Sequence, residues 1–92
     1  MSGQVIVKLD HPVTLPDREL TEVTLRRIKV KDNLSARRQG ADDAEREVIL
    51  LSRISGLNRE DIGELDMSDY FKLQEVLADF LSSAPKTPAR GS

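Results

Sequence analysis

The stretch SGLNREDIGELDMSDYFKL, residues Ser55–Leu73, contains two helix-start signals only eight residues apart. Asn58 precedes the acidic first turn of a short helix, and either Asp66 or Ser68 caps a longer one. Gly63 weakens the first helix, which we expect to last about one to two turns. Two such helices in succession form either a helix-turn-helix that reads DNA or a helical platform that holds another protein.

A further helix is predicted before them, from Asp42 to Ser55, where apolar residues recur at helical spacing and Gly56 follows as a terminator. The last helix runs to about Ser82 and has more apolar residues than packing on one neighbour requires. These residues are Tyr70, Leu73, Leu77, Phe80 and Leu81, flanked by Met67, Phe71 and Val76. The segment 31–41 indicates either a turn or a short helix over residues 35–39, ended by Gly40.

The N-terminal part alternates as β-strands do and predicts a hairpin of strands Gln4–Asp10 and Glu19–Val30, with Pro16-Asp17 in the loop. Pro12 and Pro16 break regular structure, since neither fits a central strand. The parity of the apolar residues changes near residues 25–28, which a β-bulge or a strand break would explain.

A lone hairpin is marginal in water, so it must pack on the helices. The expected fold class is therefore α+β, with an N-terminal β-hairpin packed on a small helical bundle of two main helices plus a short one. We expect one domain over residues 1–83 and a disordered, Pro- and Ser-rich tail over residues 84–92.

The amino-acid composition excludes several classes of protein. The 92 residues contain no cysteine, which excludes a disulfide scaffold, a zinc–thiolate site and a cysteine nucleophile. The first ten residues lack a basic stretch followed by a long apolar run, so no signal peptide is expected. The longest apolar run, Val48–Leu51, is too short to span a membrane.

The few residues that could act as catalytic groups or metal ligands are better explained by structural roles. His11, beside Pro12, has no second ligand or nucleophile at a recognisable spacing, which favours a loop residue over a base or metal ligand. The acidic residues of the helical half do not match a calcium loop and are interpreted as helix caps and a solvated face. We therefore expect no enzyme activity, no metal and no cofactor.

The charge is unevenly distributed. Residues 1–40 carry eight Lys/Arg against five Asp/Glu, whereas residues 41–81 carry four against eleven. The basic cluster, Arg26, Arg27, Lys29, Lys31, Arg37 and Arg38, is either a phosphate-tracking stripe, a charged sheet surface, or a contact for an acidic protein or this chain's own acidic half. Because the second helix of the opening stretch begins with carboxylates that phosphates would repel, DNA reading is disfavoured.

All three aromatic residues lie in the last helix, within one stretch of eleven residues. Since aromatic side chains are enriched at partner-binding surfaces, we predict a groove for a partner helix there. The predicted surface comprises Tyr70, Phe71, Leu73, Leu77 and Phe80, with Arg26 and Arg27 as secondary residues that steer an acidic partner. An exposed strand edge could also pair two copies of the chain as a homo-oligomer.

Three segments of the sequence are similar to a known family. Leu9, Pro12 and Val13 form an LxxPV element, an EVTLRR element follows at residues 22–27, and a leucine-rich segment covers residues 50–81. In order and spacing, over about residues 5–82, the chain resembles the small tail assembly chaperones of Mu-like and related contractile-tailed phages and prophages. The length and order of the match carry the resemblance, because no single motif is diagnostic.

The resemblance implies a non-enzymatic protein of the bacterial host cytoplasm, absent from the mature virion. Such chaperones are thought to bind the long, helical tape measure protein, or other tail proteins, and keep it soluble until the tail tube polymerises around it. A longer form is often made by translational frameshifting. We expect no small-molecule substrate and no membrane, and nucleic acid is a disfavoured partner. The alternative from another class is a small nucleic-acid-associated phage regulator that uses the basic strand.

Overall fold

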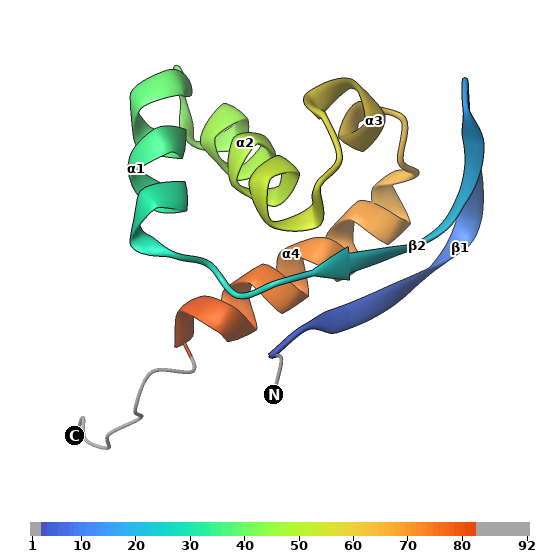
Figure 1. The fold of residues 1–92 in the computed structure, drawn as a ribbon, viewed down its shortest axis with the longest axis horizontal. Helices are drawn as coiled ribbons and strands as arrows, with labels where there is room; N and C mark the ends of the chain where they lie inside the picture. The colour runs from blue at the N-terminus through green and yellow to red at the C-terminus, as the bar shows by residue number, and fades with distance from the viewer. Residues whose placement is uncertain (1–2, 83–92) are drawn as a thin grey trace.

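The computed structural model describes residues 3–82, which form a two-stranded antiparallel sheet followed by helices (Figure 1). The elements are β1 (Val5–Leu15), β2 (Arg18–Leu25), α1 (Val30–Gln39), α2 (Asp43–Ser55), α3 (Arg59–Gly63) and α4 (Met67–Ser82). The predicted α+β class is confirmed, as is a hairpin followed by two main helices and a short one. The structure adds α1, a full helix in the segment that the sequence left open. The predicted tail, residues 84–92, lies outside the described residues.

The hairpin turns at Pro16-Asp17 as predicted, but β1 is longer than predicted. Its pairing with β2 shifts between Lys8 and Val13, where four residues of β1 oppose a single residue of β2. The expectation that Pro12 ends the strand is wrong. In a two-stranded sheet every strand is an edge, and the irregularity places Pro12 where no ladder hydrogen bond is needed.

The second strand ends at Leu25 and not at Val30, so the parity change reflects a strand break. The backbone N–H of Arg26 donates to the carbonyl oxygen of Ile54 at the end of α2, at 3.0 Å. The chain therefore leaves the sheet to meet a helix, and Val30 starts α1 instead of ending a strand. Gly40 ends α1, as predicted for a helix in this segment.

The predicted caps of the later helices are confirmed. Asp42 accepts a hydrogen bond from the N–H of Glu45 at the start of α2, at 2.9 Å. Asn58 accepts from the first turn of α3 at 2.8 Å, and Asp66 accepts from the N–H of Ser68 in α4 at 3.0 Å. Each cap satisfies a backbone donor that has no partner within its helix.

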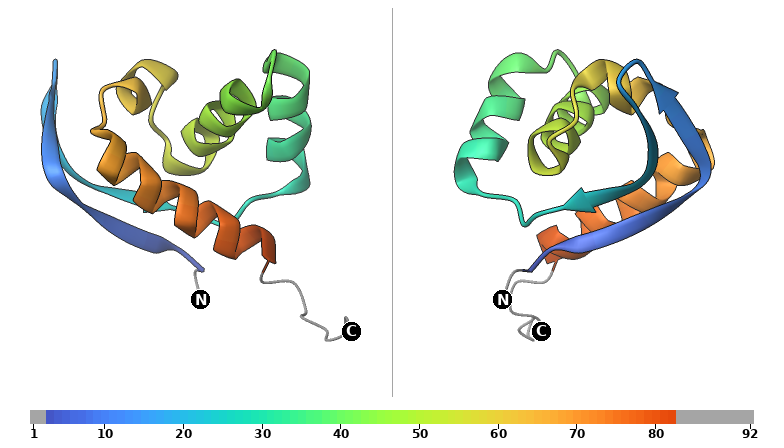
Figure 2. Two further views of the ribbon diagram at one scale, coloured as in Figure 1. Left: turned by 180° about the vertical axis from the view of Figure 1, so that it is seen from behind. Right: turned by 45° about the vertical axis from the view of Figure 1, so that its right-hand side comes forward.

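The core lies between the sheet and the helices. Leu25 of β2, Leu51 of α2 and Leu73 of α4 are completely buried at its centre. Figures 1 and 2 show α4 running along the hairpin, with α2 and α3 on the other side of it and α1 at the far edge. Consistent with the composition, the fully buried apolar residues are Leu, Ile, Val and one Ala, while Tyr70 and Phe80 only flank them. None of the helices within residues 3–82 has the length and apolar character needed to cross a membrane.

Candidate partner-binding surface

Helix α4 divides its apolar residues between two faces. One face, the inner stripe, consists of Tyr70, Leu73, Leu77 and Phe80 and packs on the core. The other, the outer stripe, consists of the apolar residues Met67, Phe71, Ala78 and Leu81 together with the half-buried polar residue Gln74. Because an α-helix turns by about 100° per residue, the two stripes lie about a quarter of a turn apart. One helix therefore serves both the core and the surface.

The outer stripe exposes large apolar side chains. Met67 is 57% exposed, Phe71 54% and Leu81 62%, and Ala78 is also exposed. Met67 and Phe71 lie one helical turn apart, and Leu81 lies further along the same helix face, so the three exposed side chains share one side of α4. The arrangement offers an apolar strip to another molecule.

The predicted site residues separate accordingly. Phe71 is exposed, and Tyr70 and Phe80 are half-buried. Leu73 is completely buried and Leu77 is 5% exposed, so both support the helix from within the core. The sequence did not separate them from the exposed residues, because all five fit one broad apolar face.

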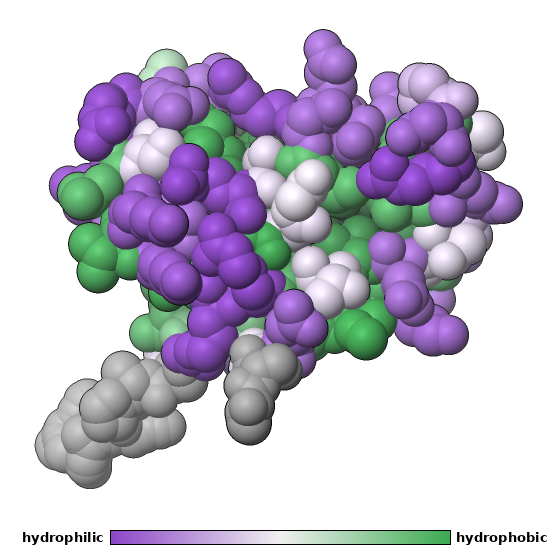
Figure 3. Space-filling view, in the orientation of Figure 1, coloured by the Kyte–Doolittle hydropathy of each residue, from purple (hydrophilic) through white to green (hydrophobic). Residues whose placement is uncertain are grey.

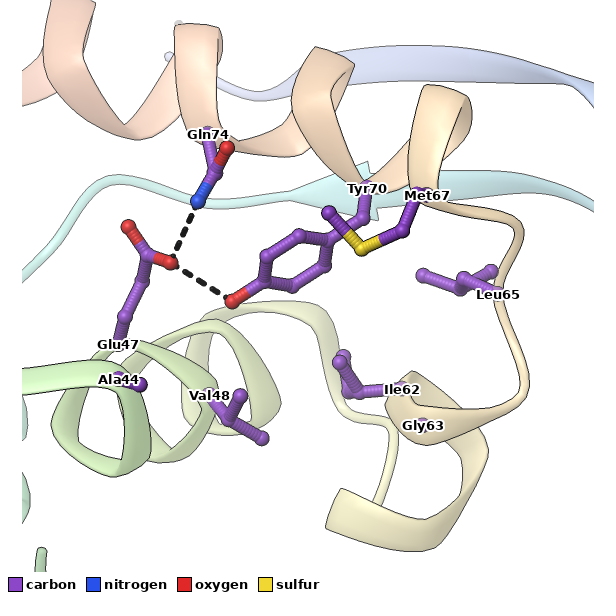
Figure 4. A pocket seen from close by; sticks show the side chains of 9 residues that line it. All are labelled: Ala44, Glu47, Val48, Ile62, Gly63, Leu65, Met67, Tyr70 and Gln74. Carbon is purple, nitrogen blue, oxygen red and sulfur yellow. Dashed lines mark hydrogen bonds between the residues drawn. The ribbon is translucent and has the colours of Figure 1, made fainter.

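A groove opens between α2 and α4 beside the outer stripe (Figure 4). It has a volume of about 340 Å³. Its walls come from three helices and the connection before α4, and the lining residues are Ala44, Glu47, Val48, Ile62, Gly63, Leu65, Met67, Tyr70 and Gln74. Met67 and Gln74 belong to both the groove and the outer stripe, which makes the two features one continuous surface.

A carboxylate lies on one wall of this groove. Glu47 accepts hydrogen bonds from the Tyr70 hydroxyl at 2.7 Å and from the Gln74 side-chain amide at 2.8 Å, both through Oε1 (Figure 4). Burial, together with the bond to this carboxylate, raises the pKa of the Tyr70 phenol. The three side chains fix the distance between α2 and α4 and hence the width of the groove.

Arg26, predicted as a steering residue on a strand, lies just after β2, and its half-buried side chain is held by a buried carboxylate. Its guanidinium donates to both oxygens of Asp32 at 2.7 and 3.0 Å, and Arg53 of α2 donates to the same carboxylate at 2.9 Å. Asp32 is completely buried. The Arg26 hydrogen bond is the largest of the interactions that hold the pKa of Asp32 far below its ordinary value.

Arg27 contacts the end of α4. Its guanidinium carbon lies 5.2 Å from the centre of the Phe80 ring, a cation–π distance. Its Nη2 atom also lies 3.5 Å from the Phe80 carbonyl oxygen. Figure 3 shows hydrophilic surface over the junction of α1, α2 and the segment that precedes α1, and apolar surface at the edge where α1 lies. Within the basic cluster, Arg26 is paired with Asp32, a carboxylate of the same basic half, and not with the acidic half that the sequence analysis considered.

Asp69 contradicts the interpretation of all the acidic helical residues as caps or a solvated face. It is completely buried, and its two oxygens accept the backbone N–H groups of Asp10 and His11, each at 2.9 Å. Burial alone would raise the pKa of Asp69, but these donors and Lys72 hold it below its ordinary value. The sequence gives no local signal for this contact, because its partners lie about sixty residues away.

Residues 3–82 contain no group of three or more His, Cys, Asp or Glu side chains that could hold a metal ion. The features that the described residues do present are an apolar strip and a groove on an acidic helical surface. Apolar strips and grooves of this kind are features that small α+β modules use to bind other proteins.

Comparison with known families makes this more specific. Residues 6–82 match the family described as "Phage tail assembly chaperone proteins, E, or 41 or 14". The match covers most of the chain, so the chain belongs to this family of phage tail assembly chaperones, and the resemblance found in the sequence is confirmed. No curated protein and no solved structure gives a significant match to the chain.

Proposed function

We propose that this chaperone binds the tape measure protein of its phage and keeps it soluble until the tail tube assembles around it. The family match over residues 6–82 is the observation that carries the proposal. On this proposal the protein acts by binding and not by catalysis, works in the cytoplasm of the bacterial host, and is absent from the finished virion.

The surface of α4 supports the proposal physically. A long helical protein with apolar stripes aggregates unless another surface covers those stripes. The exposed side chains of Met67, Phe71 and Leu81 offer such a cover. The eleven Asp/Glu against four Lys/Arg in residues 41–81 would give a coated tape measure protein net negative charge, which opposes association.

Among the predicted site residues, we assign direct contact with the partner to Phe71 and the accessible parts of Tyr70 and Phe80. Leu73 and Leu77 shape this surface from beneath, since both are buried. Arg26 positions the start of α1 through Asp32, and Arg27 positions the end of α4 through Phe80.

The test is co-expression of the full chain with the tape measure protein encoded by the same phage, followed by measurement of the soluble fraction and affinity co-elution. We expect the tape measure protein to become soluble and to co-elute. Phe71→Glu should abolish both effects. The matched control, Leu34→Glu, changes an equally exposed apolar residue on α1, where Leu34 is 51% exposed, and should leave both intact.

A thermal melt of each variant separates lost binding from lost folding. Phe71 and Leu34 are both more than half exposed, so both variants should melt close to the unmodified protein. A tape measure protein that stays insoluble while the folded chain elutes alone would refute the proposal.

A further inference from the structure

The outer stripe has the spacing of a coiled-coil interface. Its residues fall at positions 67, 71, 74, 78 and 81, with alternating separations of four and three. This alternation is the a/d pattern with which one helix packs against another. The stripe spans 14 residue steps, or about 21 Å at 1.5 Å per residue, which matches a partner helix of about four turns.

The groove beside this stripe gives the partner helix a place to insert side chains. Its walls are the apolar faces of Val48, Ile62 and Leu65, and Met67 borders it on the side of the outer stripe. A helix lying along the outer stripe would therefore direct one row of apolar side chains into the groove, as in helix-in-groove recognition.

Charge limits what this partner can be. Glu47 uses Oε1 for both of its hydrogen bonds, and within residues 3–82 no partner is found for Oε2. Two further carboxylates, Glu75 and Asp79, are exposed on α4. The one basic residue of α4 is Lys72, which already pairs with Asp10 at 2.9 Å and with Asp69 at 3.4 Å.

We propose that the outer stripe and the α2–α4 groove bind an amphipathic helix whose apolar a/d stripe is flanked by Lys or Arg, with one of these cations donating to Glu47. This inference rests on the proposed function, since it describes which segments of the tape measure protein are recognised. Apolar contact provides the affinity, and the flanking cations select among the many apolar helices of a long partner.

The test uses two synthetic helical peptides of about 21 residues, or three heptads. Both carry Leu at every a and d position, and one has Lys and the other Glu at the flanking e and g positions. Binding to the full chain is measured by isothermal titration calorimetry at about 50 mM and about 500 mM salt, where the screening length falls severalfold. We expect the Lys-flanked peptide to bind at least tenfold more tightly at low salt, and the difference to shrink at high salt.

Variants of the full chain locate the site. Met67→Ser removes apolar surface without adding charge, and Glu47→Gln removes the charge while keeping a carbonyl oxygen for the Tyr70 hydroxyl. Each variant should bind the Lys-flanked peptide about tenfold more weakly than the unmodified chain does. Glu47→Gln should also reduce the salt dependence of this affinity. Leu34→Ser, the matched change on α1, should leave the affinity within about twofold, because its side chain lies outside the groove.

Equal affinity for the two peptides would overturn the inference, and so would weakening by Leu34→Ser but not by Met67→Ser. The same variants in the co-expression assay separate the two proposals. If Met67→Ser and Glu47→Gln still solubilise the tape measure protein, this inference fails and the proposed function stands. If the unmodified chain does not solubilise it, the proposed function fails.

Discussion

Replacement of Asp32 by Ala should loosen α1 from the rest of the molecule. The carboxylate is completely buried and accepts from Arg26, from Arg53 and from the backbone N–H of Lys29 at 2.8 Å. Each hydrogen bond to a charged group is worth about 1.5–3 kcal/mol, but the two arginines keep about a third of their side-chain surface in water and can rehydrate. We therefore expect a loss of about 3 kcal/mol in the free energy of unfolding.

A loss of this size is large for such a small domain. Natural domains of this length are stable by about 5–14 kcal/mol, and each kcal/mol shifts the melting temperature by about 4–8 °C. Urea unfolding followed by far-ultraviolet circular dichroism measures the change. Asp43→Asn is the control, because that side chain is 99% exposed in its pair with Arg46 and its removal should leave the midpoint unchanged.

The pH dependence of the free energy of unfolding tests whether the charged form of Asp32 causes this stabilisation. The folded-state pKa of Asp32 lies below the unfolded value of about 3.9, so the charged carboxylate contributes fully above about pH 5 and progressively less as the pH falls towards the folded pKa. Between pH 7 and pH 3, the stability difference between the unmodified protein and Asp32→Asn should shrink by about 1.3 kcal/mol. An Asp32→Ala variant as stable as the unmodified protein, or a difference independent of pH, would refute this reasoning.

Three further changes test other contacts. Asp69→Ala leaves two backbone N–H groups of β1 without their acceptor and should cost about 2–4 kcal/mol in urea unfolding, with faster hydrogen exchange at those amides; exchange as slow as in the unmodified protein would contradict this. Gly40→Ala would place a Cβ 2.6 Å from Cγ and 2.8 Å from the backbone N of Arg46, so its melting temperature should fall, whereas Gly63→Ala meets nothing within 4 Å and should not be destabilised. Leu73→Ala creates a cavity at the centre of the core and should cost about 2–5 kcal/mol by urea unfolding; a cost below about 1 kcal/mol would show that the site collapses around the smaller side chain.

Elements with local signals could be predicted from the sequence. The side chains of Asn58 and Asp66 cap their helices by accepting hydrogen bonds from backbone N–H groups two or three residues away. Gly56 ends α2 with a φ of 79°, in the left-handed region. Pro16-Asp17 marks the turn of the hairpin in the same way. These signals depend on neighbours in sequence, which is why the order and type of these elements could be recognised.

Helix α1 could not be predicted with the same certainty, because its buried face lacks an apolar stripe. Its buried residues are Asp32, Ser35 and Ala36. What stabilises this helix is the contact of a carboxylate with arginines 6 and 21 residues away. Asp69 poses the same problem over a longer separation. In both cases a buried charge has partners that no periodicity reveals.

The division of α4 into two stripes connects stability with binding in this chaperone. The surplus of apolar residues in this helix was visible in the sequence, but their assignment to core or surface depends on a rotation of about a quarter turn, which the packing of α2 and the hairpin determines. Changes in the inner stripe, such as at Leu73, should act first on folding. Changes in the outer stripe, such as at Phe71, should act on partner binding with little effect on folding. Because both stripes share one rigid helix whose start is fixed by Asp69, a partner helix would meet a surface that is already formed, and little binding free energy would be lost in ordering it.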